Sequence, residues 1–231
     1  MNALRIAGLT VTRGAGPVIS GVDLTLEPGR ITALVGPNGA GKTSLLEAVS
    51  GVVPASAGTV HIGADEITKQ SRVSRARRGL AHIEQGRAVF GGLTVLENLM
   101  LTARTRARAD ELFELFPELE KRRDSPAALL SGGEQQMVVL ARAFAARPSF
   151  LLIDEMSLGL APVVFTRLLP MVTRFAEEGA AILLVEQFTH LALGVASDAL
   201  VVSSGRVTYA GSAQGLLDSP GTLHSAYLGE S

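Results

Sequence analysis

The segment Gly36-Pro37-Asn38-Gly39-Ala40-Gly41-Lys42-Thr43 decides how the rest of the chain is interpreted. A glycine, four further residues and then Gly-Lys-Thr form a pattern that binds phosphate when a buried strand precedes it and a helix follows. Both neighbours are present, because residues 31–35 are an apolar run and residues 44–49 favour a helix. The backbone N–H groups of such a loop turn toward phosphate oxygens, beside the positive end of the helix dipole. The segment therefore predicts a site for a nucleoside triphosphate.

The loop also supplies side chains for the same chemistry. Lys42 is expected to neutralise the outer phosphates, and the Thr43 hydroxyl to help hold magnesium. The residues expected to contact the nucleotide here are Gly36, Pro37, Asn38, Gly39, Ala40, Gly41, Lys42, Thr43 and Ser44. The alternative is a chance match in a glycine-rich turn, which partner motifs elsewhere in the chain would make less tenable.

Length and composition narrow the class of protein. A chain of 231 residues is long enough for one α/β domain, or for a domain with an inserted lobe. With 21 basic and 22 acidic residues the formal charge is −1, so no global field attracts nucleic acid or anionic lipid. Cysteine is absent, which excludes disulfides, thiolate chemistry and cysteine-ligated zinc. We predict a single domain over residues 1–231.

The sequence carries no pattern of an export signal or a membrane span. Residues 1–6 lack the basic and apolar character of an export signal. The longest uncharged run, residues 48–64, is interrupted by Gly51, Pro54 and Gly58 and cannot form a spanning helix. We therefore expect a cytoplasmic protein, which another subunit must hold if it works at a membrane.

Strand-like and helix-like segments alternate along the chain. Residues 4–30 alternate in polarity as half-buried strands do, and residues 58–63 form another short strand. The runs expected to be strands of the core are 31–35, 79–83, 150–155 and 181–185, closed by the pair 199–203 and 207–209. The pattern predicts an α/β fold with a wound, mainly parallel core sheet and a small antiparallel β subdomain.

Residues 87–147 are mostly helical in pattern and too long for a simple crossover between strands. We expect them to form a helical lobe inserted in the core. Apolar spacing places helices at 93–107 and 109–116, with Asp110 as an N-cap and Pro117 as a stop. The arginine-rich segments around this lobe are interpreted as solvated helix faces, because no aromatic residues interleave with them for stacking on nucleic acid.

A second helix start suited to an anion lies inside the lobe. The segment is Leu130-Ser131-Gly132-Gly133-Glu134-Gln135-Gln136-Met137, and an amphipathic helix follows it. Ser131 is a natural N-cap, and the two glycines after it leave backbone donors uncovered. Such a terminus can receive an anion, although Ser-Gly-Gly alone favours a plain capping turn.

Two carboxylates end the apolar run Phe150-Leu151-Leu152-Ile153-Asp154-Glu155. At the carboxyl edge of a parallel sheet, Asp154 can reach magnesium, while Glu155 points toward the terminal phosphate. A carboxylate in that position can polarise an attacking water. An Asp-Glu pair at the end of a strand is common by chance. It supports a nucleotide-binding site here because the phosphate loop is present in the same chain.

These motifs, in this order, resemble a known family. Gly36–Thr43, Gln85, Leu130–Met137 and Phe150–Glu155 are similar to the motifs of the ATP-binding subunit of ABC transporters, and the resemblance runs from about residue 4 to about residue 220. It implies the P-loop NTPase fold of that family, with ATP and magnesium as cofactors. It also implies that two subunits close head-to-tail. The turn at Ser131, Gly132 and Gly133 of one subunit would then cap the nucleotide held by the other.

Finer motifs resemble one branch of the family. Gln85–Phe90, Leu93–Leu99, Ser157–Pro162 and Leu184–Gln187 look like the second ATP-binding subunit of bacterial branched-chain amino acid importers, and importers of urea and short amides share them. The resemblance implies that Gln85 senses magnesium and nucleotide. It implies a peripheral position at the cytoplasmic face of the inner membrane. The implied partners are a paralogous ATP-binding subunit, membrane permeases and, indirectly, a solute-binding protein, with no nucleic acid.

The chain departs from the wider family at several positions. Arg13 stands where an aromatic residue usually stacks on adenine, and a guanidinium plane can also stack on a base. Gln187 replaces the switch histidine, so it can hydrogen-bond a terminal phosphate but cannot carry a positive charge to it. Glu84 and Met156 replace prolines, and Ala161 replaces an aspartate. Gln187 and Ala161 are both common in the importer branch.

The leading interpretation is a transport ATPase whose catalytic residues are Glu155, Gln85 and Gln187. One alternative is an ABC ATPase that acts in DNA maintenance or translation, and another is a regulatory partner that binds ATP but hydrolyses it weakly. The transported solute is not encoded in these motifs, because the ATP-binding subunits of this family do not contact it.

Overall fold

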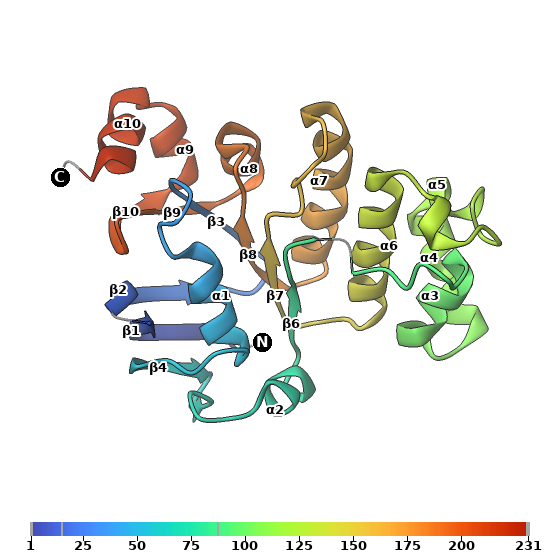
Figure 1. Ribbon diagram of the computed structural model, residues 1–231, viewed down its shortest axis with the longest axis horizontal. Coiled ribbons are helices and arrows are strands. Elements are labelled where there is room, and N and C mark those ends of the chain that lie inside the picture. Colours follow the sequence, from blue (N-terminus) through green and yellow to red (C-terminus); the bar gives the residue numbers. More distant parts are fainter. Residues whose placement is uncertain (1, 15, 87, 230–231) are drawn as a thin grey trace.

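The structure is a computed structural model that describes residues 2–14, 16–86 and 88–229. In this part of the chain the strands form a six-stranded sheet in the order β10-β9-β3-β8-β7-β6 and a four-stranded sheet in the order β2-β1-β4-β5 (Figure 1). The strands are β1 (Leu4–Arg13), β2 (Gly16–Leu26), β3 (Ile31–Val35), β4 (Ala57–Ile62), β5 (Asp65–Glu66), β6 (Leu80–Ile83), β7 (Phe150–Asp154), β8 (Ala181–Val185), β9 (Asp198–Ser203) and β10 (Arg206–Ser212).

The larger sheet is parallel except for its last strand. β3 pairs in parallel with β8 and β9, β7 pairs in parallel with β6 and β8, and β10 joins β9 in antiparallel register. Every residue of β3, β7 and β8 is buried. Such unbroken apolar strands are expected where helices or a second sheet cover both faces.

Alternate residues of β3 face two different cores. Ile31, Ala33 and Val35 pack in the core formed with the helices, and Leu34 packs in the core formed with the antiparallel sheet. Because side chains alternate across a strand, one sheet separates the two cores. The carboxyl ends of β3, β6, β7 and β8 therefore lie at one edge, where the chain leaves the sheet.

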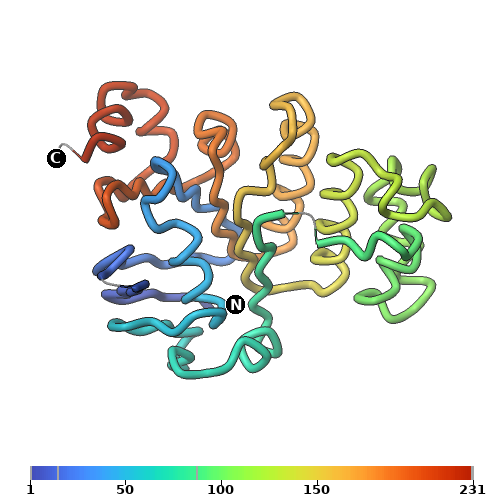
Figure 2. The backbone as a smooth tube through the Cα atoms, in the orientation of Figure 1, coloured from blue at the N-terminus to red at the C-terminus, as the bar shows by residue number. Residues whose placement is uncertain are grey.

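The helices surround this sheet unequally. Figure 1 places α1 between the antiparallel strands and β6–β7, and Figure 2 shows the segment of residues 90–145 at the end of the molecule opposite the N-terminal strands. The helices are α1 (Lys42–Ser50), α2 (Arg72–Arg77), α3 (Val95–Ala103), α4 (Arg106–Leu115), α5 (Pro117–Glu120), α6 (Gly132–Ala145), α7 (Pro162–Glu177), α8 (Thr189–Val195), α9 (Ala213–Leu217) and α10 (Pro220–Leu228), with a single helical turn at Ala127–Leu129.

The predicted α/β fold is confirmed, and the helix start in the lobe was predicted wrongly. α4 begins at Arg106 with Thr105 as its N-cap, whereas Asp110 lies inside the helix and pairs with Arg123. Threonine also starts helices well, and the apolar spacing alone does not choose among neighbouring start signals. Pro117 does stop α4, as predicted, because that helix ends at Leu115, and Pro117 is then the first residue of α5.

Over residues 2–14, 16–86 and 88–229, no helix is both long enough and apolar enough to cross a membrane.

Candidate nucleotide-binding site

The phosphate loop requires glycine at two positions where its backbone approaches neighbouring strands. Gly36 has φ 146°, and a Cβ there would lie 2.0 Å from the carbonyl oxygen of Val202. Gly41 has φ 99°, and a Cβ there would lie 2.5 Å from the carbonyl oxygen of Val18. Positive φ and backbone contact both exclude a side chain. The loop is therefore held between β2 and β9 in one conformation.

Replacing Gly41 with alanine should reduce the free energy of unfolding by about 1–2 kcal/mol, the cost of left-handed backbone in a residue with a Cβ. The contact with Val18 adds to this strain because backbone atoms cannot move aside. Urea unfolding at constant pH measures the effect. Gly221→Ala is the control, since nothing lies within 4 Å of a Cβ at that position and its φ is ordinary. Equal stability of Gly41→Ala and the unmodified protein would contradict the packing described here.

Lys42 is the cation at the centre of the loop. It is 5% exposed, and its Nζ donates hydrogen bonds to the carbonyl oxygens of Gly36 at 2.8 Å and Pro37 at 3.0 Å. Burial lowers the pKa of Lys42, and the nearby carboxylates of Glu155 and Asp154 act in the opposite direction. A buried ammonium without a full complement of anionic partners favours an anionic ligand.

A cavity of about 360 Å³ opens above this loop. Its volume lies in the range typical of small-molecule sites. The lining residues are Val18, Asn38, Gly39, Gly41, Lys42, Thr43, Ser44, Gln85, Glu155 and Gln187. The fold thus brings most of the predicted residues of the loop together with all three predicted catalytic residues. Val18, which comes from β2, was not predicted, because its place beside the loop depends on the packing of β2 against α1.

Glu155 is the carboxylate that the fold aims into this cavity. It is 7% exposed and has a left-handed backbone, with φ 45°. Its Oε2 accepts hydrogen bonds from Gln85 Nε2 and from Gln187 Nε2, each at 2.9 Å. Left-handed backbone costs about 1–2 kcal/mol in a residue with a Cβ, and such strain tends to persist at functional sites. Two amides from separate strand ends therefore hold one carboxylate in position.

Asp154 offers a carboxylate oxygen that no described group of the protein satisfies. It is 1% exposed, and its Oδ1 is buried without a hydrogen-bond partner in the described part of the chain. Burial raises the pKa of Asp154 to about 6. A hydrogen bond from the Thr43 side chain lowers this pKa but does not cancel the effect of burial. An orphaned carboxylate oxygen beside a threonine hydroxyl suits a small oxygen-loving cation. Among the described residues, no group of three or more His, Cys, Asp or Glu side chains could hold a metal ion.

The turn at Ser131 lies away from the cavity. Ser131 caps α6, since its Oγ accepts from Glu134 N at 3.3 Å while Glu134 Oε2 accepts from Ser131 N at 2.7 Å. The predicted N-cap is thus confirmed. Ser131 is exposed, Gly132 is half-buried, and neither they nor Gly133 line the cavity. Figure 1 shows α6 beyond β6 and β7 from α1. Within one chain, the two predicted anion sites therefore stay apart.

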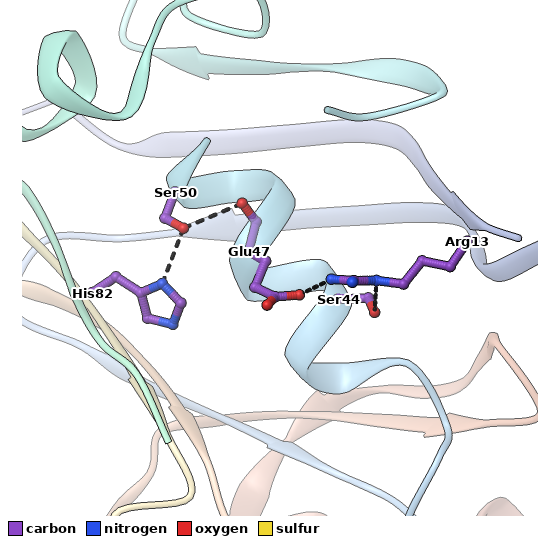
Figure 3. Close-up of polar contacts among 5 residues, drawn as sticks. All are labelled: Arg13, Ser44, Glu47, Ser50 and His82. Carbon is purple, nitrogen blue, oxygen red and sulfur yellow. Dashed lines mark hydrogen bonds and ion pairs between the residues drawn. The ribbon is translucent and has the colours of Figure 1, made fainter. Parts of the chain in front are cut away.

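Arg13 reaches the edge of the site through contacts with α1, which the sequence did not indicate. Its Nε donates to Ser44 Oγ at 3.2 Å, and its Nη2 forms an ion pair with Glu47 on α1 (Figure 3). The side chain of Arg13 therefore rests on the first turns of the helix that follows the phosphate loop.

The histidines do not gather at the cavity. His82 is the one whose pKa departs clearly from the ordinary value, because burial lowers it to about 4. Its Nδ1 lies 3.0 Å from Ser50 Oγ at the end of α1, below the site (Figure 3). His82 is thus a neutral packing residue between α1 and β6.

Sequence reasoning missed a second buried carboxylate beside the site. Glu186 is 0% exposed, and it accepts hydrogen bonds from the Oγ and the backbone N of Ser157. Burial raises the pKa of Glu186 to about 7, and the charge of Glu155 adds to the effect. Glu186 thereby links the turn that follows Glu155 to the end of β8, directly before Gln187. Its only sequence signal is a carboxylate directly after the apolar run of β8.

Replacing Glu186 with glutamine should stabilise the protein at alkaline pH. The folded-state pKa of about 7 exceeds the ordinary value of 4.5, so folding favours the protonated form. The stability of the unmodified protein must then fall as pH rises from 4.5 to about 7. The amide keeps the neutral form at every pH, with an expected gain of about 2 kcal/mol near pH 8 that fades toward pH 5. Urea unfolding across this range measures it, and a gain independent of pH would contradict the assignment.

Fold and site together define a class of protein: an α/β nucleotide-binding protein whose phosphate loop faces a carboxylate at the carboxyl edge of a parallel sheet. The sequence matches the family described as ABC transporter over residues 19–157, and the chain belongs to that family. It is an ATP-binding subunit that binds and hydrolyses ATP.

Curated relatives cover nearly the whole chain. BraG of Pseudomonas aeruginosa, a high-affinity branched-chain amino acid transport ATP-binding protein, is 36% identical over 214 residues, which make up 90% of this chain and 91% of BraG. LptB of Escherichia coli, a lipopolysaccharide export system ATP-binding protein, is also 36% identical, over 222 residues that make up 92% of this chain and 91% of LptB. The two names agree on the subunit and differ on the transported substance.

Solved structures of the same family share the fold. An ATP-binding cassette of an ABC transporter in its ADP conformation superposes with a TM-score of 0.85 at 24% identity, over 100% of both chains. An ATP-binding subunit of an ABC transporter gives a TM-score of 0.82 at 27% identity, covering 97% of this chain and 98% of the other.

Proposed function

We propose that this chain is one of the two ATPase subunits of an importer for branched-chain amino acids. The observation that carries the ATPase role is Glu155, held by Gln85 and Gln187 at the open end of the phosphate loop. The cargo class is supported by the motifs of the importer branch and by the similarity to BraG. In this proposal the whole chain is one ATPase domain, with residues 87–147 as its helical lobe. Arg87 itself lies outside the described residues.

Different residues of the cavity bind the phosphates of ATP and activate the water that hydrolyses it. Backbone N–H groups of the loop and Lys42 bind the phosphates, and Glu155 orients the attacking water and accepts its proton. Thr43, Asp154 and Gln85 would hold magnesium, together with phosphate oxygens and water. When bound, that ion neutralises phosphate charge. Gln187 donates to Glu155 and can also contact the terminal phosphate, without the charge that an imidazolium would bring.

The site is completed by a second subunit in this proposal. The turn at Ser131, Gly132 and Gly133 begins at an exposed serine and does not line the cavity of its own chain, so it would cap a nucleotide bound by the partner. ATP would then close the pair, and hydrolysis with phosphate release would reopen it. The branch motifs favour a paralogue as that partner. The permeases would hold the pair at the cytoplasmic face of the inner membrane, through the cavity that Gln85 lines together with Thr102 and Arg142 of the lobe.

Lipopolysaccharide export is the second candidate, because LptB is as similar in sequence as BraG is. The two candidates share the ATPase chemistry and differ in the membrane partners and in the direction of transport. The cavity residues therefore do not distinguish them, and the permease subunits do.

Co-purification followed by reconstitution tests the proposal. The tagged chain should be recovered with permease subunits, and proteoliposomes that contain this complex and a solute-binding protein should take up leucine in an ATP-dependent manner. A complex that instead extracts lipopolysaccharide establishes the second candidate. Recovery only with DNA or ribosomes would overturn both transport functions.

A further inference from the structure

A second cavity, which we call the α8–α10 cavity, lies between helices α8 and α10, at the end of the molecule where α8, α9 and α10 lie together (Figure 1). Its volume is about 590 Å³, which is in the range typical of small-molecule sites. Gln187 lines this cavity and also lines the nucleotide-binding cavity. A ligand in the α8–α10 cavity would therefore contact a residue of the catalytic site.

Hydrogen bonds fix the two helices that form the walls of the α8–α10 cavity. Thr189 Oγ1 lies 2.5 Å from Tyr227 OH, which joins the first turn of α8 to the end of α10. Ser203 Oγ donates to the carbonyl oxygen of Tyr227 at 2.9 Å. Thr208 Oγ1 donates to the carbonyl oxygen of Ala226 at 2.7 Å. Because α10 is bound to β9, β10 and α8, the cavity needs little rearrangement to receive a ligand.

The lining of this cavity combines an apolar wall with a polar rim. Phe188, Leu191 and Leu223 are apolar and half-buried. His190 on α8 and His224 on α10 also line the cavity and are exposed. No Asp or Glu is among the described residues that line it. Since imidazole N–H groups donate hydrogen bonds, the lining suits a molecule with an apolar body and an anionic end.

We infer that the α8–α10 cavity is a regulatory site for a small carboxylate with an apolar body, and that its ligand slows ATP hydrolysis through Gln187. The inference rests on the catalytic role that the proposed function gives to Gln187. Gln187 Nε2 donates to Glu155 Oε2 at 2.9 Å. A carboxylate bound at the rim would accept from the same amide, and the hydrogen bond to Glu155 would be lost. Lys42 is outside the described lining of this cavity, so the affinity for ATP should not change.

The backbone around Gln187 is fixed, so a ligand acts on its side chain. Thr189 N donates to the carbonyl oxygen of Gln187 at 2.8 Å. The ring of Phe188 packs against the ring of Phe165, with the ring centroids 5.6 Å apart. The expected effect is the loss of one hydrogen bond to the catalytic carboxylate, which lowers kcat and leaves the KM for ATP unchanged.

The probe for this site is 2-naphthoate, which has a flat apolar body and one carboxylate. Calorimetric titration of the full chain should give a dissociation constant of about 1 mM or lower, as expected for a ligand of this size. The neutral analogue 2-naphthamide should bind about tenfold more weakly, because hydrogen bonds to a charged acceptor are the stronger ones. Saturating 2-naphthoate should lower kcat about tenfold, the size of a hydrogen bond to a charged group. Absence of binding, equal binding of 2-naphthamide or an unchanged kcat would overturn the inference.

His224→Glu tests the location of the site, because it places a carboxylate on the rim at an exposed position. Repulsion between like charges should weaken the binding of 2-naphthoate by about tenfold or more. Hydrolysis of ATP without the probe should stay unchanged. Thr222→Glu is the matched control, because Thr222 is exposed on the same helix and outside the described lining of the cavity. Equal weakening in both variants would show a general effect of charge and would overturn the site.

Gln187→Ala separates the inference from the proposed function. Normal hydrolysis by this variant without the probe would contradict the catalytic role of Gln187, whether or not 2-naphthoate binds. Slow hydrolysis that 2-naphthoate slows further would overturn the inference alone, because the probe would then act through another residue. If a second copy of the chain covers the cavity instead, 2-naphthoate should find no site and Leu223→Lys should convert a dimer into a monomer, which would also overturn the inference.

Discussion

Glu155→Gln should slow ATP hydrolysis by at least about a hundredfold, the usual contribution of a positioned general base, while ATP still binds. The amide keeps the shape of the side chain but cannot take a proton from water. The donors that hold Glu155, Gln85 Nε2 and Gln187 Nε2, remain in place. The phosphate loop is untouched, so the affinity for ATP should be kept or increased as a negative charge leaves the site. Phosphate release under saturating ATP and equilibrium binding of ATP measure the two effects separately.

Glu120→Gln serves as the control, because Glu120 is an exposed glutamate at the end of α5, outside the cavity. It should hydrolyse ATP at the rate of the unmodified protein. Normal turnover in Glu155→Gln would show that another group activates the water. A parallel loss of ATP binding would show that Glu155 supports the nucleotide rather than the chemistry.

Lys42→Ala should weaken ATP binding by about a hundredfold or more, since charge-assisted hydrogen bonds contribute about 1.5–3 kcal/mol and each 1.4 kcal/mol is tenfold in affinity. Hydrolysis should be lost with binding. The fold should survive, because burial already lowers the pKa of Lys42 and its removal relieves a buried charge. The loss of ATP binding should therefore come without a loss of stability, which urea unfolding establishes.

Lys69→Ala is the matched control, because Lys69 is exposed and does not line the cavity. It should bind ATP as the unmodified protein does. If Lys42→Ala bound ATP with unchanged affinity, the phosphate loop would not be the nucleotide site. A joint loss of ATP binding and stability would point to a structural cause, and Lys42→Met, which keeps the length of the side chain, would then separate the loss of charge from the loss of packing.

Features whose parts are contiguous in the chain were predictable from the sequence. The run Ile31–Val35, the glycine loop and α1 follow one another directly, so strand, anion site and helix dipole are specified locally. The capping turn at Ser131 is local in the same sense, and its N-cap is confirmed. The helix start predicted at Asp110 was wrong, because several residues there can start a helix and only tertiary packing selects one of them.

The convergence of side chains was decided by the tertiary structure alone. Gln85, Glu155 and Gln187 follow strands that are far apart in sequence, and they meet because β6, β7 and β8 are neighbours in one parallel sheet. The link of Glu186 to Ser157 depends on the same neighbours. Arg13 reaches Glu47 only because β1 packs against α1. The sequence by itself determined that this chain has a phosphate-binding loop, and which types of side chain are available to bind the nucleotide and activate water. Only the fold decided which of them share a hydrogen bond, because strand order is set by packing and not by distance along the chain.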